Sequence, residues 1–317
     1  MQRYIARRLL LLPPTLLLLA IFVFVLMRAM PGDVTVALAG GEYGSISPQE
    51  AERLKEELGL NKPIVVQFGI WLSGLPRGDL GTSLVKRVPV TEILLDKAEV
   101  TLSLALMAVV LSAVWAVPIG VASAVWRGGW FDQGTRVFTA GFMAVPNFWL
   151  GIIVILVLAR MLDWSPPVQH ARLFDDPWEW FQRLIFPAAV IGIRSGAVIS
   201  RMTRSTMLDV INGDYVRTAH AKGLSPFTVI VHHALKNASL PIITMGTLLF
   251  AALLDGAVVI EQVFTLPGMG RQIIESVGAR DFIMVQGMVF ALGTLVMLWI
   301  LVTDLFYAVL DPRIRYE

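Results

Sequence analysis

The chain has 317 residues, of which 56% are hydrophobic and 16% are charged, and it contains no cysteine. Soluble domains are about 25% charged, so this composition, with a mean hydropathy of +0.69, excludes a typical water-soluble enzyme and indicates a membrane protein. The absence of cysteine excludes a disulfide framework, a thiolate metal site and a cysteine nucleophile. A net charge of +2 without a long basic run gives no indication of nucleic-acid binding.

Long apolar segments predict six transmembrane helices, because a helix needs about 20 such residues to cross the hydrocarbon core. We expect these helices near residues 9–29, 100–126, 137–160, 184–203, 238–262 and 282–304. The first segment follows Arg3, Arg7 and Arg8, as a signal peptide would, but it is longer than the roughly 7–15 apolar residues of a cleavable core. We therefore interpret it as an uncleaved span.

The lysines and arginines of the short loops are more numerous on the side of the amino terminus, which predicts that both termini are cytoplasmic. Residues 1–97 then hold the first span and an extracytoplasmic region, residues 98–310 a core of five spans, and residues 311–317 a cytoplasmic tail. In the extracytoplasmic region, Ser47, Pro48 and Glu50 form a capping box that predicts a short amphipathic helix, and Gly59 suits its carboxyl end.

No constellation in the sequence suggests catalysis or metal binding. The four histidines lie outside the predicted spans, and His232 and His233 are adjacent, so they lack the i, i+4 spacing of a helical metal pair. None of the six lysines follows a glycine, which excludes a Walker A loop in this chain. We therefore expect no catalytic residues, no metal site and no cofactor of the chain itself.

Residues 204–237 form the predicted cytoplasmic loop between the fourth and fifth spans, and they contain two capped helices. Asn212 or Asp214 can cap a helix that ends at Ala221, and Gly223 can close it in a left-handed conformation. Ser225 and Pro226 can then start a second helix that runs toward Pro241. From physics alone, ordinary interfacial helices and a docking element remain equally open.

Dispersed motifs give the chain a resemblance to a known family. The run DYVRTAHAKGLSPFTVIVHHALKNASLPIIT, at residues 214–244, resembles the cytoplasmic EAA loop of ABC-importer permeases of the dipeptide, oligopeptide and nickel branch. Further matches in the same order are PGD at 31–33, LGLNKP at 58–63, GDLGTS at 78–83, VPNFWLG at 145–151, VIEQVF at 259–264, LPGMGR at 266–271 and DPRIR at 311–315. They extend over almost the whole chain.

The resemblance implies an all-α, six-span type I permease fold in the bacterial inner membrane, and a coupling helix that docks on a cytoplasmic ATPase. Carried over to this sequence, the coupling residues are Asp214, Tyr215, Ala219, Ala221, Lys222, Gly223 and Leu224. Arg217 and Thr218 stand where the broad motif has its glutamate and first alanine. The implied partners are a second related permease, two ATPase subunits that bind ATP and Mg²⁺, an extracytoplasmic solute-binding protein and the lipid bilayer.

Charged residues inside predicted spans are functional candidates, because a charge at the bilayer centre costs at least about 2.5–3.5 kcal/mol. Arg194 lies well inside the fourth span, and Asp255 and Glu261 lie toward the outer half of the fifth. We expect Arg194 to face the central pathway and to pair with Asp255 or meet a substrate carboxylate; an ion pair without substrate contact is the alternative. Glu261 is either near an outer gate or a solvated carboxylate at a helix end.

The resemblance to this family implies an ATP-driven importer of peptides. Nickel chelates, glutathione and opines are alternative substrates that share the permease motifs. An intramembrane enzyme and a passive channel are the remote alternatives; the enzyme would need a buried nucleophile and base, and a channel has no need of a docking loop for an ATPase.

Overall fold

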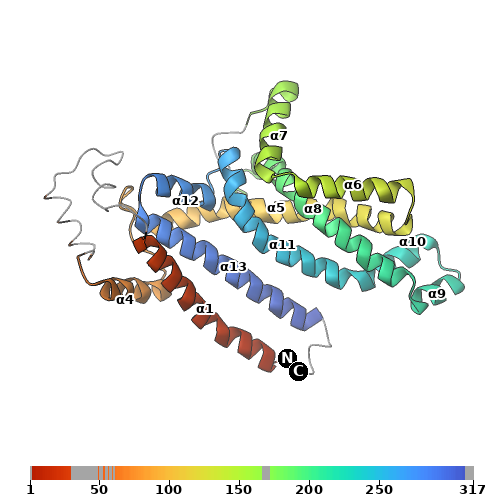
Figure 1. Cartoon of the computed structure of the whole chain (residues 1–317), viewed down its shortest axis with the longest axis horizontal. Helices are drawn as coiled ribbons and strands as arrows, with labels where there is room; N and C mark the ends of the chain where they lie inside the picture. The colour runs from red at the N-terminus through yellow and green to blue at the C-terminus, as the bar shows by residue number, and fades with distance from the viewer. Residues whose placement is uncertain are drawn as a thin grey trace. The chain divides into compact units, whose positions relative to one another are not determined.

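The computed structural model describes residues 2–29, 49, 53, 56, 59, 61–165 and 172–310. This part of the chain is helical, with one isolated β-bridge between Thr82 and Pro89. Ser47, Pro48 and Glu50, on which the predicted capping box depends, lie outside the described residues. Figure 1 shows the helices α1 (Gln2–Ala29), α4 (Ile64–Gly74), α5 (Val90–Val125), α6 (Trp130–Ala144), α7 (Asn147–Leu162), α8 (Pro177–Ile211), α9 (Asp214–Ala221), α10 (Pro226–Thr228), α11 (Lys236–Val263), α12 (Met269–Gly278) and α13 (Phe282–Leu310).

Five of the described helical segments are long and apolar enough to cross a membrane, or six if α6 and α7 form one broken span. The five are Ile5–Ala29, Val90–Val125, Pro177–Ile211, Pro226–Leu254 and Phe282–Leu305. The fold is thus an all-α membrane fold, as the apolar segments predict. Most of these helices are longer than the apolar segments predicted from the sequence, because the flanking, more polar residues are helical as well.

The third predicted span, 137–160, is wrong as a single continuous helix. The structure has α6 and α7 instead, bent by 102° at Val145 and Pro146. Pro146 has no N–H to donate, and its ring pushes Val145 into an extended conformation with φ −79° and ψ 128°. An apolar window does not reveal such a break, because hydropathy counts side chains and not backbone conformation.

The chain divides into two compact units, of which the first comprises Met1–Thr101 and Pro267–Leu301. Its hydrophobic core contains Ala20 and Val23 of α1 with Met284 and Met288 of α13. Gly293 permits close packing of the two helices, because a Cβ atom there would lie 2.9 Å from Leu19.

A buried carboxylate organises the motif-rich part of this first unit. Asp281 is 2% exposed and accepts hydrogen bonds from the Ser83 hydroxyl, from the Leu84 N–H at 3.2 Å and from the Met284 N–H at 3.1 Å. It therefore caps α13 and fixes the loop after the GDLGTS run. Gly81, in this run, has φ +97° and lies against Ile283, so glycine is required there both by backbone conformation and by space.

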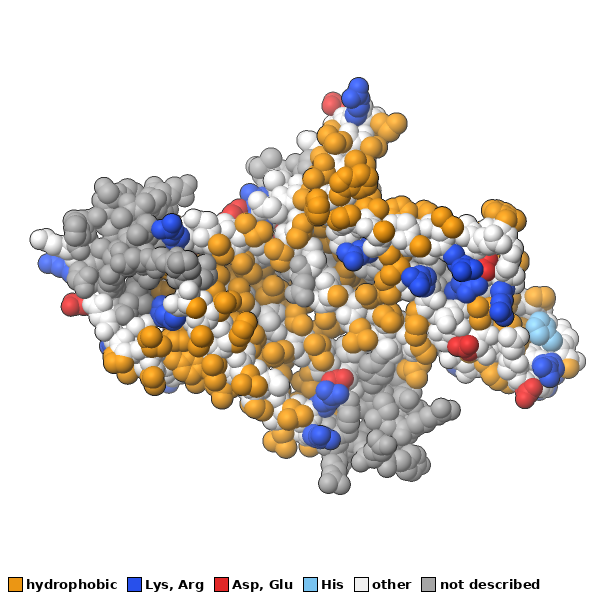
Figure 2. Space-filling view, in the orientation of Figure 1, with side chains coloured by type: hydrophobic (Ala, Val, Ile, Leu, Met, Phe, Trp, Pro, Cys, Tyr) orange, Lys and Arg blue, Asp and Glu red, His pale blue; other side chains and the backbone are white. Residues whose placement is uncertain are grey.

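The second unit comprises Leu102–Leu266 and Val302–Glu317, and α8 is its central helix. Two thirds of the apolar window of α8 is buried, against one third or less for the other four candidate spans, so α8 has the least surface left for lipid. Its contact with α5 is close at Gly120, where a Cβ atom would lie 2.6 Å from Thr203 Cβ and 2.7 Å from the Ser200 carbonyl oxygen. α7 differs from α8, since hydrophobic side chains cover much of its visible surface in Figure 2.

Candidate functional site

The segment between α8 and α11 forms a short helix and a sharp turn at one end of the second unit (Figure 1). The capping residue of α9 is Gly213, in an extended conformation, and not Asn212 or Asp214 as predicted. The Asn212 amide instead donates to the Leu208 carbonyl at 3.1 Å, at the end of α8. The predicted helix therefore exists and ends at Ala221, as predicted. Its start is set by the extended backbone of Gly213, which the residue types alone do not reveal.

The turn after α9 has the geometry of a Schellman motif. Gly223 has φ +80°, its N–H donates to the His220 carbonyl at 2.9 Å, and the Leu224 N–H donates to the Ala219 carbonyl at 3.4 Å. The predicted left-handed glycine is confirmed. Ser225 then caps the next helix by accepting from the Thr228 N–H at 3.3 Å, with Pro226 in the first position, as predicted.

The second helix of this segment is continuous with the candidate membrane span that follows it. α10 continues through a π-helical turn, Val229–Leu235, directly into α11, and Pro241 lies inside α11. The turn at Gly223 is therefore joined to a candidate span without a flexible link. Single π-helical turns often mark functional positions in helices.

One face of α9 packs on the chain's own core. Val216 is 3% and Ala219 is 5% exposed, and both belong to a cluster with Met207 of α8 and Val229 and Ala234 of the π-helical turn. Ala219, which the resemblance assigns to the partner contact, thus lies inward. Its small side chain permits close approach of α9 to its own chain.

The other predicted coupling residues lie on the exposed surface of this segment: Asp214, Tyr215, Ala221, Lys222, Gly223 and Leu224. Phe227, which sequence reasoning missed, is 72% exposed beside them. We call Tyr215, Leu224 and Phe227 the apolar tip. These three exposed apolar side chains belong to one short segment of the chain, and an exposed apolar patch marks an interaction site more often than scattered apolar residues do. In Figure 2 charged and histidine side chains surround this end.

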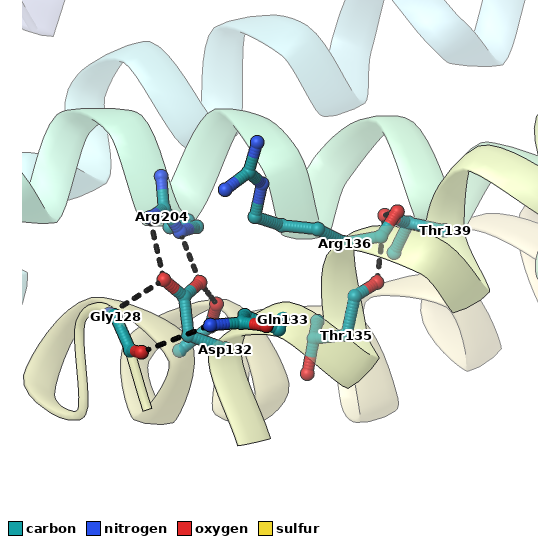
Figure 3. Close-up of polar contacts among 8 residues, drawn as sticks. Gly128, Asp132, Gln133, Thr135, Arg136, Thr139 and Arg204 are labelled. Atoms are coloured by element: carbon teal, nitrogen blue, oxygen red, sulfur yellow. Dashed lines mark hydrogen bonds and ion pairs between the residues drawn. The ribbon is translucent and has the colours of Figure 1, made fainter. Parts of the chain in front are cut away.

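A buried ion pair that the sequence did not reveal lies between α6 and α8 (Figure 3). The Asp132 side chain is 1% exposed, and Arg204 donates to its two oxygens from Nε at 2.6 Å and from Nη2 at 2.8 Å. The Ser123 hydroxyl and the Gly128 N–H also donate to Asp132, at 2.6 and 2.9 Å. The carboxylate thus joins α8 to the turn between α5 and α6.

Two of the motifs in the sequence pack against each other in the second unit. Gly151, in VPNFWLG, lies in close contact with α11 and its end, because a Cβ atom there would lie 3.2–3.5 Å from the side chains of Phe264, Val263 and Ile260. The latter two belong to α11 and lie beside Glu261, which is fully buried. Burial rules out the solvated carboxylate considered for Glu261.

Arg194 and Asp255 cannot be compared as a pair, because the side chain of Asp255 lies outside the described residues. Arg194 is exposed on α8, and it has no hydrogen bond or ion pair to the side chains that the structure describes. Those side chains also contain no group of three or more His, Cys, Asp or Glu residues that could hold a metal ion.

Comparison with known proteins decides the family. Residues 116–316 match the family model described as "Binding-protein-dependent transport system inner membrane component", and residues 1–105 match the model for the N-terminal part of such membrane components. The chain belongs to this family of permeases. It is a type I ABC-importer permease, as its dispersed motifs indicate.

Similar permeases cover nearly the whole chain. A putative peptide transport system permease protein of Brucella abortus (strain 2308) is 38% identical over 96% of each chain. The oligopeptide transport system permease protein AppB of Bacillus subtilis (strain 168) is 38% identical, and the glutathione transport system permease protein GsiC of Salmonella choleraesuis (strain SC-B67) is 37% identical, each over the full length of both chains. These relatives are named as permease components of transporters and not as enzymes.

Within a permease, the described geometry separates two kinds of candidate residue. The exposed residues of α9 and the apolar tip are available for contact with another protein, whereas Glu261 and the Asp132–Arg204 pair are internal. Arg194 belongs to neither group, because it is an exposed charged residue on a helix that is otherwise largely buried.

Proposed function

We propose that this permease is one half of the translocation path of an ATP-driven importer for peptides, including peptide-like solutes such as glutathione, in a bacterial inner membrane. Support comes from the family and from relatives named for peptide, oligopeptide and glutathione transport. Nickel chelates and opines are the alternative substrates. Both termini then lie in the cytoplasm, and the apolar tip faces the same compartment.

The observation that carries the coupling role is the geometry of α9 and the turn that follows it. The inner face of α9 is fixed to the chain's own core by Val216 and Ala219, while Tyr215, Leu224 and Phe227 remain exposed. A short helix that packs on its own chain along one face, and that has exposed apolar side chains at its start and just beyond its end, is suited to enter a groove of a partner. Through α10 and the π-helical turn, movement of that partner passes directly to α11.

The complete transporter in this proposal contains a second related permease, two ATPase subunits and an extracytoplasmic solute-binding protein. The ATPase subunits bind ATP and Mg²⁺, since no lysine of this chain follows a glycine as a Walker A loop requires. In this proposal the permease itself supplies no catalytic residue, metal or cofactor. Its two arrangements, open inward and open outward, differ in their affinity for partner and solute, because only such a difference can shift their populations.

The exposure of Arg194 on α8 suggests that this residue contacts the substrate path or the second permease. A charge exposed on the lipid-facing side of a span is expensive, so an exposed arginine on α8 needs water, a partner or a substrate carboxylate beside it. We propose that Arg194 lines the substrate pathway and that Asp255 lies next to it. Glu261 is then a buried residue that stabilises the structure near the outer gate.

The coupling role is tested by purifying the tagged chain from its native host in mild detergent. Wild type is expected to carry ATPase subunits and to hydrolyse ATP. Gly223→Pro is expected to lose most of that activity, at least about tenfold, because proline fixes φ near −65° where the Schellman motif needs a positive value. The matched control is Gly78→Pro, since Gly78 also has a left-handed φ, of +77°, and open space around it.

A second variant keeps this test independent of backbone damage. Replacing the apolar tip by serine at Tyr215, Leu224 and Phe227 leaves the buried face of α9 intact, and it is expected to release the ATPase subunits. Phe174→Ser, at a side chain 92% exposed on the segment before α8, is expected to retain them. Retention of coupled ATPase activity by both the Gly223 and the tip variants would contradict the coupling role.

The pathway role of Arg194 is tested separately in reconstituted vesicles. Arg194→Gln is expected to assemble and to bind the ATPase subunits but to lower peptide uptake at least about tenfold, since a hydrogen bond to a charged group contributes about 1.5–3 kcal/mol. Arg160→Gln, at an exposed arginine in the last turn of α7, is the charge control. Uptake at the wild-type rate by an assembled Arg194→Gln transporter would exclude the pathway assignment.

A further inference from the structure

A pocket of about 440 Å³ lies in the second unit, where α7 ends and α8 begins. Four aromatic side chains line it: Trp164, Trp178, Phe181 and Phe186. Trp164 and Phe186 meet edge to face at 5.0 Å, and Trp178 stacks on Phe181 at 6.0 Å. The pocket is therefore largely apolar, with an arginine and a glutamate, Arg183 and Glu179, among its lining residues.

Arg183 brings into this pocket hydrogen-bond donors that have no acceptor among the described residues. The residue is 6% exposed, and its Nη2 donates to the Glu179 carboxylate one turn earlier in α8. Its Nε and Nη1 are buried and have no hydrogen-bond partner in the part of the chain that the structure describes. Leaving a buried donor unpaired is costly, and more so when the group is charged, so a further acceptor at Arg183 would be strongly favoured.

The position of Arg183 along α8 indicates which acceptor is available. It directly precedes the apolar segment that begins at Leu184, so it lies at the boundary of the hydrocarbon core. Trp164 and Trp178 are of the residue type that gathers at the headgroup level. The anions present at that level in a bilayer are the phosphates of lipids, and a guanidinium forms strong charge-assisted hydrogen bonds with phosphate oxygens.

We propose that this pocket binds one anionic phospholipid, whose phosphate accepts hydrogen bonds from Arg183 and whose glycerol and upper acyl chain contact the aromatic walls. The site lies at the start of α8, whereas α9 follows the end of α8. It attaches the start of α8, the most buried candidate span, to the leaflet around it. A bound lipid then stabilises the position of α8.

Native mass spectrometry of the full chain, released from nanodiscs of phosphatidylglycerol or of phosphatidylcholine, tests the proposal. Wild type is expected to retain one phosphatidylglycerol more tightly than any phosphatidylcholine. Arg183→Gln is expected to bind that lipid at least about tenfold more weakly, since two hydrogen bonds to a charged group are lost. Arg160→Gln, at an exposed arginine in the last turn of α7, is expected to match wild type.

Two further measurements separate lipid binding from damage to α8 and from binding of a free anion. Glu179→Gln removes the internal partner of Arg183 and is expected to retain the lipid, whereas loss of lipid in both variants would show damage to the start of α8 and overturn the proposal. Inorganic phosphate is the probe for a free anion, and displacement of the lipid by it at comparable concentration would also overturn the lipid assignment. The same holds if wild type does not distinguish phosphatidylglycerol from phosphatidylcholine.

Discussion

Asp132→Ala is expected to lower the free energy of unfolding by about 3–5 kcal/mol, the range for removing one partner of a buried ion pair. The loss is large because the carboxylate accepts four hydrogen bonds from three separate segments: two from Arg204 and one each from Ser123 and Gly128. Without it, the guanidinium of Arg204, 23% exposed, remains largely buried without its partner. Titration with sodium dodecyl sulfate in detergent micelles, followed by circular dichroism, measures the change.

A matched control for this prediction is the exposed pair of Asp214 and Arg217, 3.5 Å apart with side chains 95% and 80% exposed. Asp214→Ala is expected to change the free energy of unfolding by less than about 0.5 kcal/mol, because solvent screens such pairs. The double variant Asp132→Leu with Arg204→Met is expected to be more stable than Asp132→Ala alone, since it leaves no unpaired charge. If the single and double variants lost the same free energy of unfolding, the shape of the side chains, and not their charge pairing, would account for the contribution of this site to stability.

Gly120→Ala is expected to destabilise the second unit by about 3 kcal/mol, at the upper end of the usual cost of overpacking a core. The added methyl group would meet the Ser200 carbonyl oxygen at 2.7 Å and Thr203 Cβ at 2.6 Å. Neither atom belongs to the flexible end of a side chain, so α5 and α8 must move apart. Thermal denaturation monitored by size-exclusion chromatography detects the loss.

Glycines of α6 provide the comparison for Gly120. Gly134 and Gly141 are both helical and have nothing within 4 Å of an added Cβ atom. Alanine at either is expected to be neutral or to stabilise the helix by up to about 1 kcal/mol, because glycine is the poorer helix former. If Gly120→Ala matched these two variants, the close approach of α5 and α8 would not contribute to stability.

Local backbone chemistry explains which parts of the coupling segment could be predicted. The left-handed turn at Gly223 and the cap formed by Ser225 and Pro226 depend on residues adjacent in the sequence, and both are confirmed. The predicted capping residue of α9 is wrong, because Asn212 is used instead at the end of α8. A side chain that can serve either of two neighbouring helix ends cannot be assigned from composition.

Long-range pairing and burial account for the rest. Asp132 and Arg204 are 72 positions apart, and no periodicity connects them, so only the packing of α6 on α8 reveals the pair. The same applies to Ala219, which the motif assigns to a partner but which packs inward. The break at Pro146 is concealed by the apolar residues on both sides of it, although the proline itself is a signal that could reveal it.

The continuity of the helix that starts at Pro226 has a mechanical consequence. Its membrane-spanning candidate segment, Pro226–Leu254, has 29 residues and therefore extends about 44 Å. A rod of this length that tilts by about 5° about its turn displaces its far end by about 4 Å, which exceeds the helix shifts of about 1–2 Å seen at switching interfaces. A small change in angle at Gly223 is thus amplified into a side-chain-sized displacement at the opposite end of the same helix.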